Sequence, residues 1–163
     1  MNATNVLDNA FAPSGNESGL YLSFSLADAE YAVDILRVRE IRGICAITPI
    51  PQSAPHVRGV MNLRGAVVPV IDLRAALNVE QAEYGKFTVI IVLSVHGRTV
   101  GFVVDSVSDV LSLDGSAIER SPDLGGRVDA SLVEGIARTQ DRFVVLIDID
   151  RVTVGDLPNG EAA

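Results

Sequence analysis

The sequence carries two imperfect copies of one residue pattern, one after the other. When the chain is shifted by 69 positions, residues 31–41 lie over residues 100–110. When it is shifted by 76 positions, residues 67–73 lie over residues 143–149 without a gap. A chance likeness between Val-rich stretches is the alternative, but glycines and carboxylates match in the same order. The pattern therefore predicts two copies of one supersecondary unit.

Both copies are expected to be rich in β-strands. The chain has 23 Val and 12 Ile residues, whose branched side chains favour strands. Apolar and polar residues alternate from Tyr21 to Leu26 and again from Tyr31 to Ile35, which predicts a hairpin. Each copy has about five strands in roughly 65 residues, too few to bury a core alone. We therefore expect two small barrels, at about residues 20–83 and 87–152, packed together.

Short helices are expected between some of these strands. Asp72 is a candidate cap for a short helix that runs through Leu77, and Ser53 for a one-turn helix towards Arg58. The stretch Leu36–Ile41 mixes charged and apolar residues and fits either a helical turn or a bent strand.

Composition and charge exclude several classes of function. A formal net charge of −8 and a pI near 4.6 argue against a nucleic-acid partner, because such partners select basic surfaces. The single cysteine, Cys45, favours a reducing compartment. Residues 1–19 lack the basic and apolar segments of a signal peptide, and no apolar run is long enough for a membrane helix. We therefore expect a cytoplasmic protein without membrane insertion, with residues 1–19 as a flexible tail and residues 153–163 as a C-terminal tail.

Residue patterns for catalysis or metal binding are weak. His56 and His96 are expected at the surface, and with one distant cysteine they do not supply a zinc site. Asp148 and Asp150 would share one face of a strand, where solvation is a better interpretation than acid–base chemistry. Gly125-Gly126 fits a turn and not a phosphate-binding loop. The sequence predicts no catalytic residue, metal or cofactor, while a small hydrolase on a β scaffold stays open as an alternative.

A different signal comes from polar residues that lie beside apolar ones near expected turns. Glu40 follows Val38 by two positions, and Asn62 and Arg64 precede Gly65. Arginine next to apolar groups is typical of protein contact sites, because its planar head pairs while its stem packs. The alternative is that these are surface charges without a role.

Three segments together resemble the CheW family: residues 31–42, residues 57–65 with the following 68–74, and residues 101–111. The most specific element is Asn-Leu-Arg-Gly followed closely by Pro-Val-Ile-Asp-Leu-Arg. The resemblance runs from about Leu20 to Val152. It implies two five-stranded SH3-like β-barrels around a shared hydrophobic core, with a few short helices, which agrees with the expectation from the repeat.

The resemblance also implies a function. CheW is the coupling protein of bacterial chemotaxis, so the implied role is that of a non-catalytic adaptor at receptor arrays on the inner face of the membrane. Its implied partners are the CheA histidine kinase, whose regulatory domain has the same fold and packs barrel against barrel, and chemoreceptor cytoplasmic tips, which dock between the barrels. The alternative is a CheW-like adaptor of a chemosensory-like pathway with another output, such as pili.

Matched position by position, Glu40 and Arg64 correspond to a charged pair that matters for coupling in relatives. The resemblance implies partner-binding roles for eight residues: Val38, Glu40, Gly59, Asn62, Arg64, Gly65, Val103 and Val104. The chain departs from the family's pattern in connectors, at Cys45 and Gly125-Gly126 among others, where variation affects partner choice more than the fold.

Overall fold

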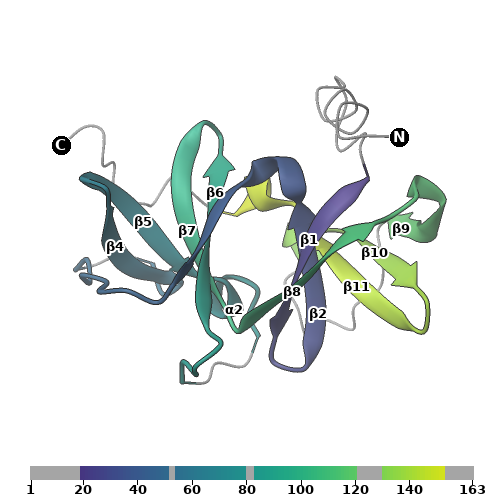
Figure 1. Cartoon of the computed structure of the whole chain (residues 1–163), viewed down its shortest axis with the longest axis horizontal. Helices are drawn as coiled ribbons and strands as arrows, with labels where there is room; N and C mark the ends of the chain where they lie inside the picture. The colour runs from purple at the N-terminus through teal and green to yellow at the C-terminus, as the bar shows by residue number, and fades with distance from the viewer. Residues whose placement is uncertain (1–18, 52–53, 80–82, 121–129, 153–163) are drawn as a thin grey trace.

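The computed structural model describes residues 19–51, 54–79, 83–120 and 130–152. Within these ranges the chain is mainly β, and its strands form two sheets that lie side by side along the long axis of the molecule (Figure 1). The prediction of a mainly β fold with a few short helices is confirmed. Ser53, Gly125-Gly126, the expected C-terminal tail and all of the expected N-terminal tail except Gly19 lie outside the described residues.

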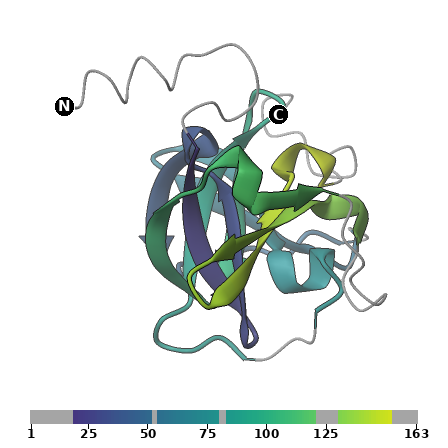
Figure 2. The same ribbon diagram turned by 90° about the vertical axis from the view of Figure 1, so that its right-hand side faces the viewer.

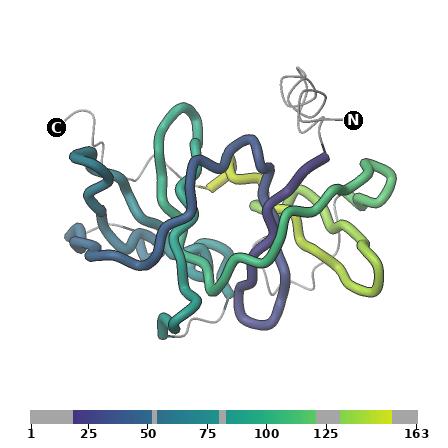
Figure 3. Tube along the Cα trace, viewed as in Figure 1, coloured from purple at the N-terminus to yellow at the C-terminus, as the bar shows by residue number. Residues whose placement is uncertain are grey.

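The first copy of the repeat runs from a hairpin to a short helix. Its elements are β1 (Leu20–Leu26), β2 (Ala29–Asp34), the 3₁₀ helix η1 (Ile35–Arg37), β3 (Val38–Gly43), β4 (Val57–Leu63), β5 (Ala66–Asp72) and α2 (Leu73–Ala76). The second copy follows the same order, which can be traced in Figure 3, with extra short elements after its third strand. Its elements are β6 (Val89–Val95), β7 (Arg98–Val104), β8 (Ser106–Ser112), η2 (Gly115–Ala117), β9 (Ile118–Arg120), η3 (Ala130–Leu132), β10 (Val133–Thr139), β11 (Arg142–Ile147) and η4 (Ile149–Arg151).

Turn geometry recurs at the two shifts found in the sequence. Ala27 in the β1–β2 turn has a φ of 55°, and His96, 69 positions later, has a φ of 52°. Arg64 in the β4–β5 turn has a φ of 52°, and Gln140, 76 positions later, has a φ of 53°. Tight hairpin turns need this left-handed backbone. The strands and turns of the two copies are therefore built alike.

The two sheets do not follow the two halves of the chain. The six-stranded sheet has the order β8-β1-β2-β11-β10-β9, and the five-stranded sheet has the order β3-β6-β7-β5-β4. The first hairpin of each copy thus joins the sheet of the other copy, through parallel pairs of β2 with β11 and of β5 with β7. Figure 2 looks onto the six-stranded sheet, where β1 and β2 from the start of the chain accompany β10 and β11 from its end.

This exchange of hairpins corrects one expectation. The expected division into barrels at about residues 20–83 and 87–152 separates the two sequence copies but not the two sheets. The physical reason is that a repeat specifies local strands and turns, whereas strand partners are chosen by which apolar faces meet in space.

Each sheet curls until the chain that leaves one edge strand reaches the opposite edge. After β3, Thr48 pairs with Val60 of β4. After β8, Glu119 of β9 pairs with Ile136 of β10, which lies 76 positions beyond Val60. The short strand β9 is therefore the counterpart of the bridge at Thr48, and it gives one sheet its sixth strand. Such pairing covers strand edges that would otherwise be exposed.

A shared apolar core lies between the sheets. Phe24 of β1 and Phe102 of β7 are both fully buried in it, although they belong to different sheets. Alternate residues of the same strands point the other way, into a smaller cluster inside each sheet. The expected shared core is thus present, and a strand such as β6 is apolar on both faces, with Ile91 in the shared core and Ile90 in the smaller cluster.

Two ion pairs join the sheets where the chain crosses between them; we call them the crossover ion pairs. Arg37 lies between β2 and β3, and its guanidinium donates two hydrogen bonds to Asp150, one of them 2.6 Å long from Nη1 to Oδ1, and a third to the backbone O of Ser94. Asp105 lies between β7 and β8 and accepts from Arg74 of α2, with 2.7 Å from Nε to Oδ1. The two crossover ion pairs lie at nearly equivalent positions of the two copies, with the acidic and the basic residue exchanged.

The short elements meet the expectations in part. Asp72 caps α2, because its carboxylate accepts from the backbone N of Arg74 at 3.0 Å. The stretch after Asp34 combines both alternatives, a 3₁₀ turn followed by a strand. The expected one-turn helix before Arg58 is wrong: Pro55 and His56 form a turn and β4 already begins at Val57, since His56 O accepts from the N of Asp72 at 2.8 Å.

Asp148 and Asp150 do not share a strand face either. β11 ends at Ile147, and Asp148 caps η4 by accepting from the backbone N of Asp150 at 3.2 Å. Asp150 instead faces Arg37 in a crossover ion pair. Among the described residues, none of the helices has the length and apolar character needed to cross a membrane.

Candidate partner-binding surface

The structure brings together Glu40 and Arg64, the two residues predicted to form a charged pair. Glu40 lies on β3 and Arg64 lies in the turn between β4 and β5, at opposite edges of the five-stranded sheet. Nη2 of Arg64 donates to Oε2 of Glu40 at 2.5 Å, and Nη1 lies 3.5 Å from Oε1. The side chain of Arg64 is 68% exposed, so the pair lies at the surface and stays open to a partner.

The electrostatics of this pair follow from its geometry. The hydrogen bond from Arg64 holds the pKa of Glu40 below its ordinary value, and Arg42, with Nη1 at 3.5 Å from Oε1, acts in the same direction. Exposed ion pairs of this kind contribute little to folding stability. A bidentate pair that costs little to break is suited to exchange its partner for one on another protein.

Asn62 and Gly65 build the turn that presents Arg64. The side-chain O of Asn62 accepts from the backbone N of Gly65 at 2.8 Å, and Gly65 has a φ of 91°. The tight turn needs a left-handed backbone at both Arg64 and Gly65, which arginine adopts less readily than glycine, so the Asn62 hydrogen bond helps to hold the turn. These two residues therefore position the arginine.

Gly59 has a structural role at this site. It is buried, has a φ of 145°, and a Cβ added to it would lie 2.0 Å from the backbone O of Thr48. A Cβ added to Gly135, 76 positions later, would likewise lie close to a backbone oxygen, 2.8 Å from the O of Glu119. In both sheets the glycine lets the returning chain approach closely and close the sheet.

The apolar candidates divide into one near the surface and two inside. Val38 is half-buried at the start of β3, beside Leu36, which is 43% exposed. Val103 and Val104 are 2% and 1% exposed and lie in the five-stranded sheet's own cluster and in the shared core. Their side chains do not reach the surface, so direct contact with a partner is not their role in this structure.

Exposed apolar side chains were missing from the prediction, and four of them occupy matched positions in the two copies. Ile41 is 46% exposed and Val110, 69 positions later, is 49% exposed. Val67 is 50% exposed and Phe143, 76 positions later, is 59% exposed. Each sheet therefore carries exposed apolar side chains at equivalent positions, Ile41 and Val67 in the five-stranded sheet and Val110 and Phe143 in the six-stranded sheet; we call them the matched apolar residues. The repeat alignment places these residues over one another, but it carries no sign of their exposure.

The groups that would suggest other chemistry are dispersed. Among the described residues, no three His, Cys, Asp or Glu side chains gather as metal ligands. His96 is exposed, with Nε2 at 2.8 Å from the backbone O of Asp150, and His56 is half-buried. Cys45 is half-buried, with its Sγ 3.8 Å from the Sδ of Met61. A cavity of about 310 Å³ lies beside Phe143 and is lined mainly by small and apolar side chains and by Arg138 and Glu119.

The chain is similar in sequence to a known protein family and to several of its members. Residues 20–155 match the family described as "CheW-like domain". The "Chemotaxis protein CheW" of Klebsiella aerogenes is 40% identical over 132 residues, 81% of this chain and 80% of that protein. The protein of the same name from Rhizobium meliloti is 40% identical over 131 residues, 80% of this chain and 84% of its own length.

Two further similarities extend this picture. The crystal structure of the scaffolding protein TtCheW from Thermoanaerobacter tengcongensis superposes with a TM-score of 0.77 at 31% identity, covering 86% of this chain and 99% of that one. "Protein FrzA" of Myxococcus xanthus is 28% identical over 131 residues, 80% of this chain and 81% of that protein.

Proposed function

Because the chain belongs to the CheW-like domain family, we propose that it is a scaffold protein of bacterial chemotaxis without catalytic activity, which couples chemoreceptor cytoplasmic tips to a CheA-type histidine kinase. In this role it acts in the cytoplasm, at receptor arrays on the inner face of the membrane. It needs no metal and no cofactor, since its work is to hold two other proteins.

The observation that carries the proposal is the pair of equivalent outer surfaces. An adaptor must hold more than one protein at a time, and each sheet carries its own matched apolar residues at the surface. A partner domain built on the same fold would pack against these residues sheet against sheet. Interfaces of transient signalling type bury on the order of 1,200 Å² or less and give roughly micromolar binding.

Glu40 and Arg64 are the polar part of this contact surface. Arginine at an interface combines a packed stem with bidentate pairing, and here its turn is fixed by Asn62 and Gly65. Val38 lies on the same strand as Glu40 and offers an apolar neighbour for a receptor helix, which would insert its apolar side chains as helices do in grooves. Weak single contacts then gain from the multivalency of an array.

The test is calorimetry of the purified full chain with the regulatory domain of a CheA kinase from the same genome, with and without a receptor cytoplasmic fragment. We expect binding of the kinase domain in the micromolar range and a ternary complex with the receptor fragment. Absence of heat and of co-elution with either protein would refute the proposal. A substrate screen with turnover abolished by one substitution would instead establish an enzyme.

A second candidate is an adaptor of a related pathway with another output, such as pili. The similarity to Protein FrzA favours keeping it, because that relative does not carry the name of a chemotaxis protein. Parallel binding measurements with every CheA-type kinase of the genome separate the two, since the pathway is given by the kinase that binds most tightly.

A further inference from the structure

The cavity of about 310 Å³ beside Phe143 opens on the outer face of the six-stranded sheet. Side chains alternate across this sheet, so Ala137 and Val144 are buried inside it, while Ile136 and Phe143 face the other way and line the cavity. Phe143 is 59% exposed, although the guanidinium of Arg138 lies 5.3 Å from the centre of its ring. An exposed aromatic ring at an open cavity offers apolar area that a further segment can bury.

Apolar contact, more than charge, decides what fits this cavity. Arg138 and Glu119 both line it, so their formal charges cancel. The other lining residues are small or apolar: Ser116, Ala117, Ile118, Ile136 and Phe143. The occupant therefore needs an apolar side chain, best an aromatic one, on a segment without many charges.

The first copy of the repeat lacks this aromatic wall. Val60, Asn62 and Val67 stand 76 positions before Ile136, Arg138 and Phe143. Neither the ring nor the cation beside it is present at those positions. The arrangement is thus particular to the six-stranded sheet, and Val67 provides a matched control for Phe143.

The described chain begins beside the cavity. The backbone O of Gly19 accepts from the N of Leu113 at 2.7 Å, and Ser116, three positions after Leu113, already lines the cavity. Three residues span at most about 10 Å, so the distance from Gly19 to the cavity is short. Figure 1 shows the start of β1 and the strand β9 at the same end of the molecule.

The residues ahead of Gly19 contain a side chain of the required kind. Residues 5–12 have the sequence Asn-Val-Leu-Asp-Asn-Ala-Phe-Ala, and Phe11 is the one aromatic residue among residues 1–18. Phe11 precedes Gly19 by eight positions, and eight extended residues span up to about 26 Å, which is ample to reach the cavity. So short a connection gives an effective concentration in the millimolar range, at which a weak contact suffices.

We infer that residues 5–12 fold back onto the outer face of the six-stranded sheet and place the ring of Phe11 in the cavity beside Phe143. The segment then covers Phe143, one of the matched apolar residues, and leaves its counterpart Val67 uncovered. The inference rests on the place of Gly19, the lining of the cavity and the sequence of residues 5–12. It does not depend on the proposed function.

The first test uses fluorescence. The sequence contains no tryptophan, so Phe11→Trp in the full chain introduces a single indole. We expect it to emit at shorter wavelength than N-acetyltryptophanamide, with an acrylamide quenching constant about threefold or more lower, because the docked ring is buried. Adding Phe143→Ser should remove most of this protection. Emission and quenching equal to those of the free indole would overturn the inference.

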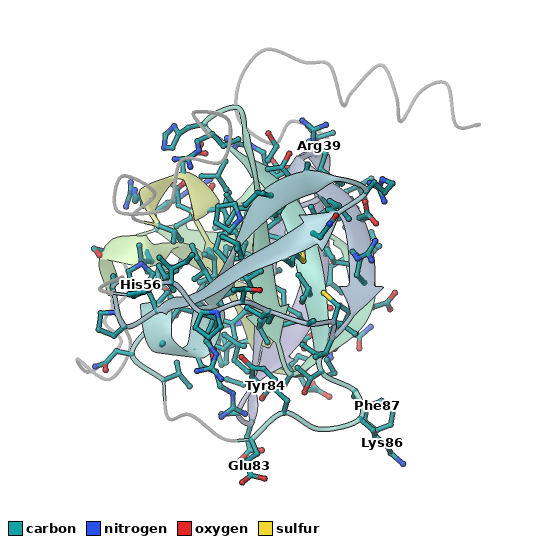
Figure 4. The ribbon with its side chains drawn as sticks, turned by 90° about the vertical axis from the view of Figure 1, so that its left-hand side faces the viewer. Arg39, His56, Glu83, Tyr84, Lys86 and Phe87 are labelled. Carbon is teal, nitrogen blue, oxygen red and sulfur yellow. The ribbon has the colours of Figure 1, made fainter. Side chains whose placement is uncertain are left out.

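Two exposed apolar side chains on or next to the five-stranded sheet serve as controls. Val67→Ser changes the counterpart of Phe143. Phe87→Ser removes a ring that is 67% exposed and also lies beside a cation, with the Nζ of Lys86 5.3 Å from its centre (Figure 4). Neither change should alter the fluorescence of Phe11→Trp. An effect of either one as large as that of Phe143→Ser would refute the docking.

The second test needs no new indole. In the ¹⁵N-labelled full chain, Phe11→Ser should shift the amide resonances of Ile118, Ile136 and Phe143 and leave that of Val67 in place. Shifts confined to the neighbours of Phe11 would contradict the inference. Both tests are repeated on dilution, and loss of the effects at low concentration would also overturn it, since a second copy would then supply the segment.

Discussion

Arg37 and Asp150 lie 113 positions apart in the chain and form a bidentate ion pair at the point where the first copy of the repeat crosses from one sheet to the other. The other crossover is held by Arg74 and Asp105, with the acid now on the crossover and the base on the short helix. Asp105 also accepts from the backbone N of Ala27 at 2.7 Å, and Ala27 is the counterpart of His96 at the first joint. The two joints are thus alike in geometry and reversed in charge.

Loss of one crossover ion pair should destabilise the fold. We expect Arg37→Leu to lower the free energy of unfolding by about 1–2 kcal/mol, because a half-buried carboxylate loses its hydrogen bonds. Chemical denaturation of Arg37→Leu, Asp150→Leu and the double variant measures the coupling between the two side chains. A coupling energy indistinguishable from zero would mean that the pair contributes nothing.

The same pair gives the stability a pH dependence of known sign. The hydrogen bond from Arg37 lowers the pKa of Asp150 below its ordinary value of 3.8. A lowered folded-state pKa contributes stability that is present above pH 3.8 and is lost as the pH falls through the folded-state value. We expect unfolding free energy below pH 4 to fall more steeply in the unaltered chain than in Asp150→Asn; parallel curves would contradict this.

Arg64→Glu tests the candidate contact surface. It replaces an attractive pair with Glu40 by a repulsive one at an exposed turn, so the melting temperature should change by less than about 3 °C. Kinase activation in a reconstituted array of receptor, kinase and this chain should fall about tenfold or more. Normal activation by Arg64→Glu would remove Arg64 from the surface. The double variant Glu40→Arg with Arg64→Glu serves as the control, since it restores the pair but not its direction.

The two glycines of the candidate site should respond differently to the same change. Gly59→Ala forces a Cβ against the backbone O of Thr48 at 2.0 Å, so we expect a loss of about 3 kcal/mol or more, or failure to fold. Gly65→Ala meets no atom within 4 Å and should cost only about 1–2 kcal/mol for its left-handed backbone. Circular dichroism melts of both variants compare them directly, and equal losses would count against a closing role for Gly59.

The sequence predicts the local part of this structure well. The strands, the turns and the cap at Asp72 are visible because each depends on residues close together in the chain. The Glu40–Arg64 pair was also indicated, through the family resemblance and through the apolar residues beside each charge. The distance between the two side chains depends on how the five-stranded sheet curls, and a local residue pattern does not predict that curl.

The non-local part was not predictable in the same way. Val103 and Val104 were expected to bind a partner, but both faces of β7 are covered, one by the shared core and one by the sheet's own cluster. The residue pattern of an apolar strand is the same whether a partner or the protein's own core covers the strand. The crossover ion pairs were missed for a similar reason, since charges separated by 113 positions have no signature in spacing.

Because of the hairpin exchange, substitutions in one copy of the repeat constrain those in the other. Each joint takes one charge from each copy, so a reversal of sign in one copy is tolerated only with a matching reversal in the other. Duplicated halves in separate domains would be free to diverge or to be lost one at a time. Here neither half can be discarded or replaced by recombination without dismantling both sheets, and variation among relatives should appear as correlated substitutions across the repeat.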